Sequence, residues 1–177
     1  MLGPRDIELV AQARLGIGDA DEPHATFVEN ALAKAFHAAR ASGLPALADD
    51  SGICVDALSG APGVRSARFA GEPRSDERNN AQLLRVLSGH SNRRAHYFCV
   101  IVLVRHTGDP CPLIADASWD GEIAETPRGV NGFGYDPYFY VPSLGLTAAE
   151  LDPELKNRLS HRAKALEALL ARLPAAP

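Results

Sequence analysis

Two adjacent carboxylates, Asp49 and Asp50, follow the short apolar run 44–48 and precede Ser51 and Gly52. The run has the composition of a buried strand, and ligands of α/β proteins bind just beyond the C-terminal ends of strands. Magnesium takes one or two carboxylates together with phosphate oxygens and waters, and a carboxylate can also deprotonate an attacking water. The segment therefore predicts an acidic turn that holds Mg²⁺, although a solvated turn has the same composition.

A second candidate is the glycine-rich segment 129–137. Its glycines allow the backbone to approach a ligand closely, and Phe133 and Tyr135 offer flat faces on which a base can stack. Asp136 can accept hydrogen bonds from N–H groups of a ligand. The same residues are equally compatible with a hairpin loop whose aromatic rings pack into the core.

A third candidate begins at Lys156 and ends at Arg162. Ser160 can cap a helix, which places His161 and Arg162 in its first turn, where free N–H groups favour anions and acceptors. Basic side chains there oppose the helix dipole, and such local conflicts are typical of functional sites. A solvated helix start explains the same pattern.

The segment before residue 30 adds further carboxylates. Thr26 and Glu29 have the spacing of a capping box, so we assign Glu29 to the helix cap first. Asp21 and Glu22 lie in the acidic loop that precedes this helix. Either one can supply a second metal ligand, or both can simply be solvated.

Helices and strands must position these residues, and the sequence predicts a mixture of both. An apolar run that is β-branched on both faces, 95–104, predicts a central strand. Mixed elements in this order indicate α/β or α+β with a mostly buried sheet. The expected strands are 7–12, 44–48, 53–55, 95–104 and one or two within 113–124. The expected helices are 26–42, 75–87 and a C-terminal helix with Leu166, Leu169, Leu170 and Leu173 on one face.

The bulk composition narrows the class of protein. A chain of 177 residues suits one domain, and a net charge of −4 provides no basic field for a nucleic-acid backbone. Three cysteines without a CxxC pair disfavour a zinc site or a disulfide framework. Without a signal peptide or a long apolar segment, we expect a cytoplasmic protein that binds neither membranes nor nucleic acid.

Taken together, the motifs resemble the inosine triphosphate pyrophosphatase family, the bacterial dITP/XTP pyrophosphatases. The matching stretches run in order along nearly the whole chain: 26–31, 44–52, 60–64, 66–71, 127–129, 132–137, 156–157 and 160–162. The resemblance implies hydrolysis of noncanonical purine nucleoside triphosphates (dITP, ITP and XTP) to the monophosphate and pyrophosphate. It also implies an elongated, two-lobed α/β fold with a central mixed, twisted sheet flanked by helices, Mg²⁺ as cofactor and a homodimer.

The resemblance also assigns roles to residues. Asp50 matches the proton acceptor and magnesium ligand, Glu22 falls near a second metal ligand, and Ser51 matches a substrate contact. The base-side contacts match Phe133, Gly134, Tyr135, Asp136, Lys156, His161 and Arg162. A site that pairs with a 6-oxo group rejects adenine, because its polar groups would then lose their partner.

One departure from the family concerns the N-terminus. Family members open with a strand, a Gly-Asn-x-Gly-Lys-like loop that binds the triphosphate, and a helix, and residues 1–4 look like the end of that helix. Roughly 20 residues are absent by the size of such a unit. We therefore expect this form to be weakly active or inactive and less stable than a longer one. Two alternatives to the function that the resemblance implies stay open. The protein is a non-catalytic nucleotide-binding remnant, or it is a Maf-like pyrophosphatase that acts on modified pyrimidine nucleotides.

Overall fold

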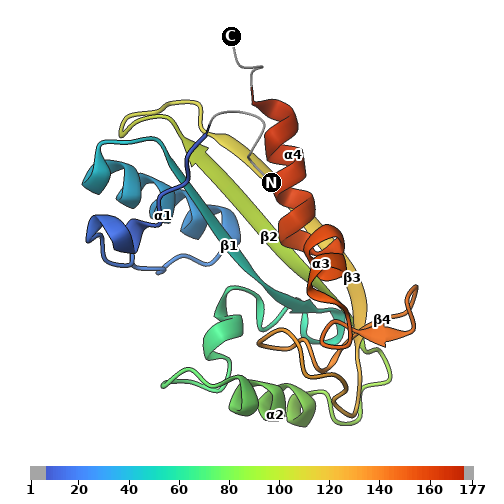
Figure 1. Ribbon diagram of the computed structural model, residues 1–177. Helices are drawn as coiled ribbons and strands as arrows, with labels where there is room; N and C mark the ends of the chain where they lie inside the picture. The colour runs from blue at the N-terminus through green and yellow to red at the C-terminus, as the bar shows by residue number, and fades with distance from the viewer. Residues whose placement is uncertain (1–6, 174–177) are drawn as a thin grey trace.

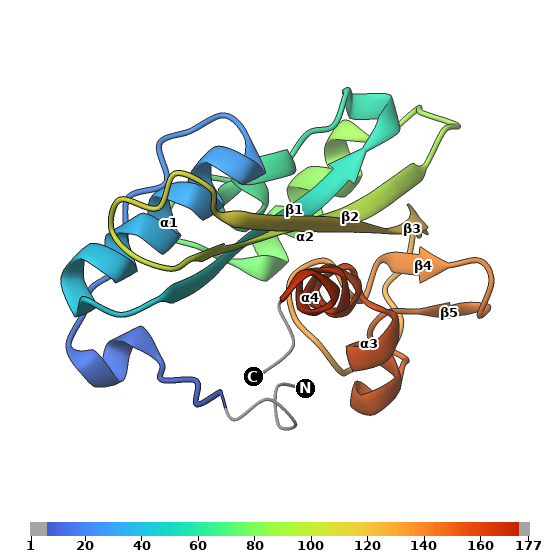
Figure 2. The same ribbon diagram turned by 90° about the horizontal axis from the view of Figure 1, so that it is seen from above.

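A computed structural model describes residues 7–173 and shows a single sheet with helices on both faces (Figures 1 and 2). The strands are β1 (Ala46–Val55), β2 (Arg94–Val104), β3 (Leu113–Ile123), β4 (Phe139–Val141) and β5 (Leu146–Thr147). The α-helices are α1 (Phe27–Ser42), α2 (Asp76–Val86), α3 (Pro153–Leu159) and α4 (His161–Arg172). Short 3-10 helices are η2 (Gln12–Leu15), η3 (Asp56–Leu58) and η4 (Gly63–Arg68).

The sheet follows the order β1-β2-β3-β4-β5. Each pairing within residues 7–173 is antiparallel, whereas the resemblance implied a mixed sheet. The expected α/β fold is confirmed, and so is the central position of β2, which lies between β1 and β3. In Figure 1 the long strands run between an upper part, which carries α1 and α4, and a lower part that contains α2.

Helices α1 and α4 cover opposite faces of the three long strands (Figure 2). Three alanines of α1, Ala31, Ala35 and Ala39, are fully buried against alternate residues of β1 and β2. Their small side chains let the helix approach the sheet closely. On the other face, Ala165 and Leu169 of α4 pack on β2 and β3. A third apolar cluster fills the lower part of the molecule.

The helix boundaries follow the expected caps. The Thr26 hydroxyl accepts from the Glu29 N–H at 3.4 Å, and Gly43 ends α1 in the left-handed region, with φ of 72°. The Glu29 carboxylate accepts from the Thr26 hydroxyl at 2.5 Å rather than from its backbone N–H, so only half of the capping box forms. Ser160 caps α4 by accepting from the Ala163 N–H at 3.3 Å, as expected.

Two expectations about local structure are wrong. Residues 7–12 form no strand, because a 3-10 turn starts at Gln12 and Ile7, Leu9 and Val10 remain exposed instead of pairing with a sheet. The acidic segment is no turn either, since a single strand, β1, runs through Asp49–Gly52. None of the helices in the described range is long and apolar enough to cross a membrane.

Gly52 explains why the segment resembles a turn in the sequence. This glycine is needed for a close approach and not for a reversal of the chain. A Cβ atom at Gly52 would lie 2.3 Å from the carbonyl oxygen of Gly63 and 2.5 Å from the Ser66 hydroxyl. The strand therefore requires glycine where η4 crosses it.

Candidate functional site

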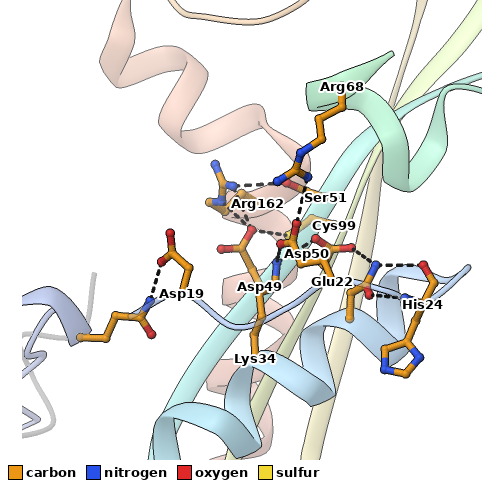
Figure 3. Close-up of polar contacts among 12 residues, drawn as sticks. Asp19, Glu22, His24, Lys34, Asp49, Asp50, Ser51, Arg68, Cys99 and Arg162 are labelled. Atoms are coloured by element: carbon orange, nitrogen blue, oxygen red, sulfur yellow. Dashed lines mark hydrogen bonds and ion pairs between the residues drawn. The ribbon is translucent and has the colours of Figure 1, made fainter. Parts of the chain in front are cut away.

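The candidate site lies along β1, which is the edge strand of the sheet within residues 7–173. Asp50 points to the α1 face and is only 9% exposed. Its Oδ1 atom lies 2.8 Å from Lys34 Nζ, and the same Nζ lies 2.8 Å from Glu22 Oε1 (Figure 3). The structure thus brings together the two carboxylates expected to bind a metal and places an ammonium group between them.

Asn30 fixes this arrangement. It lies one helical turn before Lys34 on α1, so both side chains reach the same part of β1. Its amide donates to Asp50 Oδ2 at 3.4 Å and to the His24 carbonyl at 3.3 Å, while its oxygen accepts from the His24 N–H at 3.0 Å. These contacts attach the acidic loop to the helix and hold Glu22 beside the strand.

The charges of this cluster are closely coupled. Burial raises the pKa of Asp50, and the lowering effect of Lys34 offsets this only in part. Burial also raises the pKa of Glu22, but Lys34 and Arg68 outweigh it, and the net shift is downward. Arg68 Nη1 lies 3.6 Å from Glu22, and its Nε donates to Glu72 at 2.6 Å. A carboxylate with a raised pKa is a stronger base toward water than an ordinary aspartate.

Asp49 and Ser51 point to the opposite, α4 face of β1. Arg162 Nη2 donates to Asp49 Oδ2 at 2.8 Å and to the Ser51 hydroxyl at 3.2 Å. The buried Cys99 thiol lies 3.8 Å from Asp49, and burial raises the pKa of this thiol to about 12. Cys99 is therefore a protonated core residue.

The glycine-rich loop is closed by the buried carboxylate of Asp136. Its Oδ2 accepts from the Phe133 N–H at 2.8 Å and from the Lys156 ammonium, and its Oδ1 accepts from the Tyr97 hydroxyl at 3.3 Å. The Phe133 ring is 69% exposed, with Lys156 Nζ 4.9 Å from its centre. Phe133 is thus an exposed aromatic residue with a cation over its ring.

Tyr135 does not fit the expectation of a stacking surface. Its ring is 4% exposed and belongs to the lower core, and its hydroxyl donates to the Ser66 carbonyl at 2.8 Å. The neighbouring carbonyl of Gly134 accepts from the Asn80 amide at 2.9 Å, and its N–H donates to Asp76 at 2.6 Å. These contacts hold the loop in place.

His161 begins α4 and packs flat against Tyr97. The ring centres are 4.8 Å apart and the ring planes differ by 8°. Burial, together with the cations Arg162 and Lys156, lowers the pKa of His161 to about 3, so the imidazole is neutral at physiological pH. Its Nδ1 atom is buried and makes no hydrogen bond within the described structure.

The donor set fits a hard divalent cation that is completed by a phosphate ligand. No group of three or more His, Cys, Asp or Glu side chains in residues 7–173 is arranged to hold a metal. Glu22 and Asp50 already converge on one cation, the Lys34 ammonium, and Mg²⁺ commonly uses one or two carboxylates with phosphate oxygens and waters. These two residues could therefore hold Mg²⁺ together with a triphosphate.

Several residues of this site were missed by the sequence interpretation. Sequence patterns alone assign no role to Lys34, Asn30 or Arg68, and the resemblance assigns the chemistry to Asp50 and not to Asp49. The four-residue spacing of Asn30 and Lys34 on a predicted helix was an available signal. The expectation for residues 1–4 lies outside the described residues, and the expected absence of the phosphate-binding loop stays a prediction.

The fold and these contacts define an α/β protein with two features: an edge strand whose Asp50 carboxylate pairs with Lys34, and a loop that exposes Phe133. Residues 1–172 match the model of the Ham1 family, and the chain belongs to this family.

Its relatives agree with this assignment. The dITP/XTP pyrophosphatase of Aromatoleum aromaticum is 64% identical over 177 residues, which is 100% of this chain and 89% of the relative. That of Nitrosomonas europaea is also 64% identical, covering 98% of this chain and 85% of the relative. The solved HAM1 protein from Coxiella burnetii aligns with a TM-score of 0.90 at 51% identity, covering 94% of this chain and 85% of the other.

Proposed function

We propose that this protein hydrolyses noncanonical purine nucleoside triphosphates, dITP, ITP and XTP, to the monophosphate and pyrophosphate. Such an enzyme removes deaminated purines from the nucleotide pool. The observation that carries the proposal is the convergence of Glu22 and Asp50 on one positive charge, the ammonium group of Lys34, at the edge of β1. It is supported by relatives of 60–64% identity that are named dITP/XTP pyrophosphatases.

In the proposed mechanism, Asp50 is the general base that accepts a proton from the attacking water. Its buried position and raised pKa support this role. Glu22 and Asp50 would hold Mg²⁺, which would neutralise charge on the phosphates. Lys34 and Arg68 provide further positive charge beside the carboxylates. The reaction breaks the anhydride between the α- and β-phosphates, and pyrophosphate leaves.

The base of the nucleotide is proposed to lie at the glycine-rich loop. The exposed ring of Phe133 supports a stacking role, and Lys156 and Arg162 supply donors for the oxygens of a deaminated purine. A neutral His161 can offer one N–H and one acceptor. Donors directed at a 6-oxo group find no acceptor on adenine, which carries a 6-amino group at that position, so adenine nucleotides are rejected.

The remaining features of the proposal concern the whole protein. We propose that residues 1–177 form a single nucleotide pyrophosphatase domain that acts in the cytoplasm as a homodimer. We also propose that the protein binds no nucleic acid, which the net charge of −4 supports.

The test is pyrophosphate release from dITP, XTP, dATP and modified pyrimidine nucleotides with Mg²⁺. We expect turnover of dITP and XTP above that of dATP, and a fall in kcat of about 100-fold or more for Asp50→Asn, because general-base catalysis contributes on this scale. Asp120→Asn, which alters an exposed carboxylate on β3, is the matched control.

Other outcomes would favour the alternatives. Equal rates for the wild type and Asp50→Asn would contradict the role of Asp50. A preference for modified pyrimidine nucleotides would indicate a Maf-like enzyme. Binding of dITP without pyrophosphate release would indicate a non-catalytic nucleotide-binding protein.

A further inference from the structure

The ammonium group of Lys34 lies between the two carboxylates that the proposed function assigns to the metal. Lys34 Nζ is 2.8 Å from Glu22 Oε1 and 2.8 Å from Asp50 Oδ1. All three side chains are less than one-third exposed, at 22% for Lys34, 29% for Glu22 and 12% for Asp50. A cation that uses these same two oxygen atoms has to displace the ammonium from them.

The charges of the cluster are balanced without a metal. Lys34 and Arg68 carry two positive charges, and Glu22 and Asp50 carry two negative charges. Glu72 lies further out, is 65% exposed and pairs with Arg68. A divalent cation alone would therefore add two charges to a neutral, half-buried cluster, beside an ammonium group that had lost both of its partners.

We propose that Lys34 excludes free divalent cations from Glu22 and Asp50, so that the metal binds only together with the triphosphate. This inference rests on the proposed function. The triphosphate supplies the negative charge that the cluster lacks, and its oxygens become the new partners of the displaced ammonium. Lys34 thereby couples the binding of metal to the binding of nucleotide.

The site allows this exchange without a rearrangement of the fold. The Lys34 side chain is a flexible stem with three rotatable donors on a rigid helix, so its ammonium can move a short distance. Asn30 continues to hold both Asp50 and the His24 backbone when Lys34 moves. Lys34→Met, which keeps an unbranched stem of similar length, is therefore a suitable variant.

The experiment measures binding of Mn²⁺, as a spectroscopic substitute for Mg²⁺, to the nucleotide-free protein by electron paramagnetic resonance. We expect Lys34→Met to bind Mn²⁺ at least tenfold more tightly than the wild type. Lys34→Arg keeps the positive charge and should bind as weakly as the wild type. Lys164→Met removes a positive charge on α4 whose ammonium contacts the Ser118 carbonyl, and it should leave Mn²⁺ binding unchanged.

A second measurement repeats the titration with a non-hydrolysable imido analogue of dITP. The analogue should strengthen Mn²⁺ binding by the wild type far more than binding by Lys34→Met. If folded Lys34→Met binds Mn²⁺ no more tightly than the wild type without nucleotide, the inference is wrong. A circular dichroism melt of each variant establishes that it is folded.

Adding Asp50→Asn separates failure of this inference from failure of the proposed metal site. Tight Mn²⁺ binding by Lys34→Met that persists in the double variant with Asp50→Asn would place the metal elsewhere and overturn the proposed site. A different pair of results would overturn only the role of Lys34. In that case Asp50→Asn abolishes Mn²⁺ binding in the presence of the dITP analogue, which supports the metal site, but nucleotide-free Lys34→Met binds Mn²⁺ no more tightly than the nucleotide-free wild type.

Discussion

Asp49 and Asp50 are consecutive in the sequence, yet their carboxylates lie on opposite faces of β1 and contact different helices. Asp50 bonds to Lys34 of α1, and Asp49 bonds to Arg162 of α4. This follows from the alternation of side chains along a strand. One dipeptide therefore joins the carboxylate cluster of the proposed metal site to the arginine that is proposed to contact the base.

Asp49 is expected to act on base recognition through Arg162. In Asp49→Asn, Arg162 loses its charged partner, and we expect the KM for dITP to rise about fivefold with a smaller change in kcat. A fivefold rise in KM corresponds to about 1 kcal/mol of binding free energy. A larger effect is not expected, because the ion pair between Asp49 and Arg162 is partly exposed to solvent. Steady-state kinetics with dITP and dATP measure it.

The discrimination between dITP and dATP should fall in the same variant. Asp49→Glu, which keeps the charge, should recover part of the lost discrimination, whereas a purely structural role would not depend on the charge. An unchanged KM for dITP in Asp49→Asn would show that Arg162 needs no partner on β1.

Gly52 is expected to tolerate no side chain. In Gly52→Ala the new Cβ would meet the Gly63 carbonyl oxygen at 2.3 Å and the Ser66 hydroxyl at 2.5 Å. Overpacking of this kind costs about 1–3 kcal/mol, so the free energy of unfolding should fall by about 2 kcal/mol or more. Urea denaturation measures the change. Gly18→Ala meets no atom within 4 Å and should have little effect, and equal stability of the two variants would contradict the close contact.

Much of the fold could be predicted from the sequence because its signals are local. Thr26, Ser75 and Ser160 each cap the helix that follows. The apolar run of β2 indicated its central position, since only a strand covered on both faces has this composition. These features depend on the residue and its near neighbours alone.

The details that could not be predicted depend on contacts between distant segments. Asp50 and Lys34 are 16 residues apart, and they meet only because α1 packs on β1 in one register. The segment around Gly52 has the composition of a turn, and only the crossing of η4 shows why a strand needs glycine there. Tyr135 could be either a stacking surface or a core residue, and its burial depends on the packing of the lower part of the molecule.

Asp136 and Lys156 are expected to be strongly coupled. Their side chains are only 3% and 16% exposed, and Asp136 also holds the Phe133 N–H and the Tyr97 hydroxyl. We expect Asp136→Asn and Lys156→Met each to destabilise the protein, because each leaves a buried charge without its partner. The double variant should be less destabilised than the sum, with a coupling energy of about 1–3 kcal/mol.

Chemical denaturation of the four proteins provides this double-mutant cycle. Lys164→Met, paired with Asp136→Asn, is a control cycle in which the two side chains share no contact and the effects should add. Additivity in the Asp136 and Lys156 cycle would mean that the ion pair contributes nothing to stability.

His161 is expected to make the protein sensitive to acid. Its pKa is lowered to about 3 in the folded state, while an unfolded histidine titrates near its ordinary value of 6.5. Between these two values the unfolded chain binds more protons than the folded one, so stability falls as the pH falls. The slope approaches about 1.4 kcal/mol per pH unit, and His161 alone should reduce stability by about 2 kcal/mol between pH 7 and pH 5. In His161→Gln this contribution disappears, so its unfolding free energy should depend less on pH than that of the wild type. The stability of this variant at pH 7 can still be lower, because the stack on Tyr97 is lost.

His106→Gln, at an exposed position, is the control. Titration by NMR offers an independent measurement, in which the imidazole signals of His161 should not shift between pH 8 and pH 5. A midpoint near 6.5 for this residue, or parallel pH profiles for the wild type and His161→Gln, would contradict a buried neutral imidazole at the start of α4.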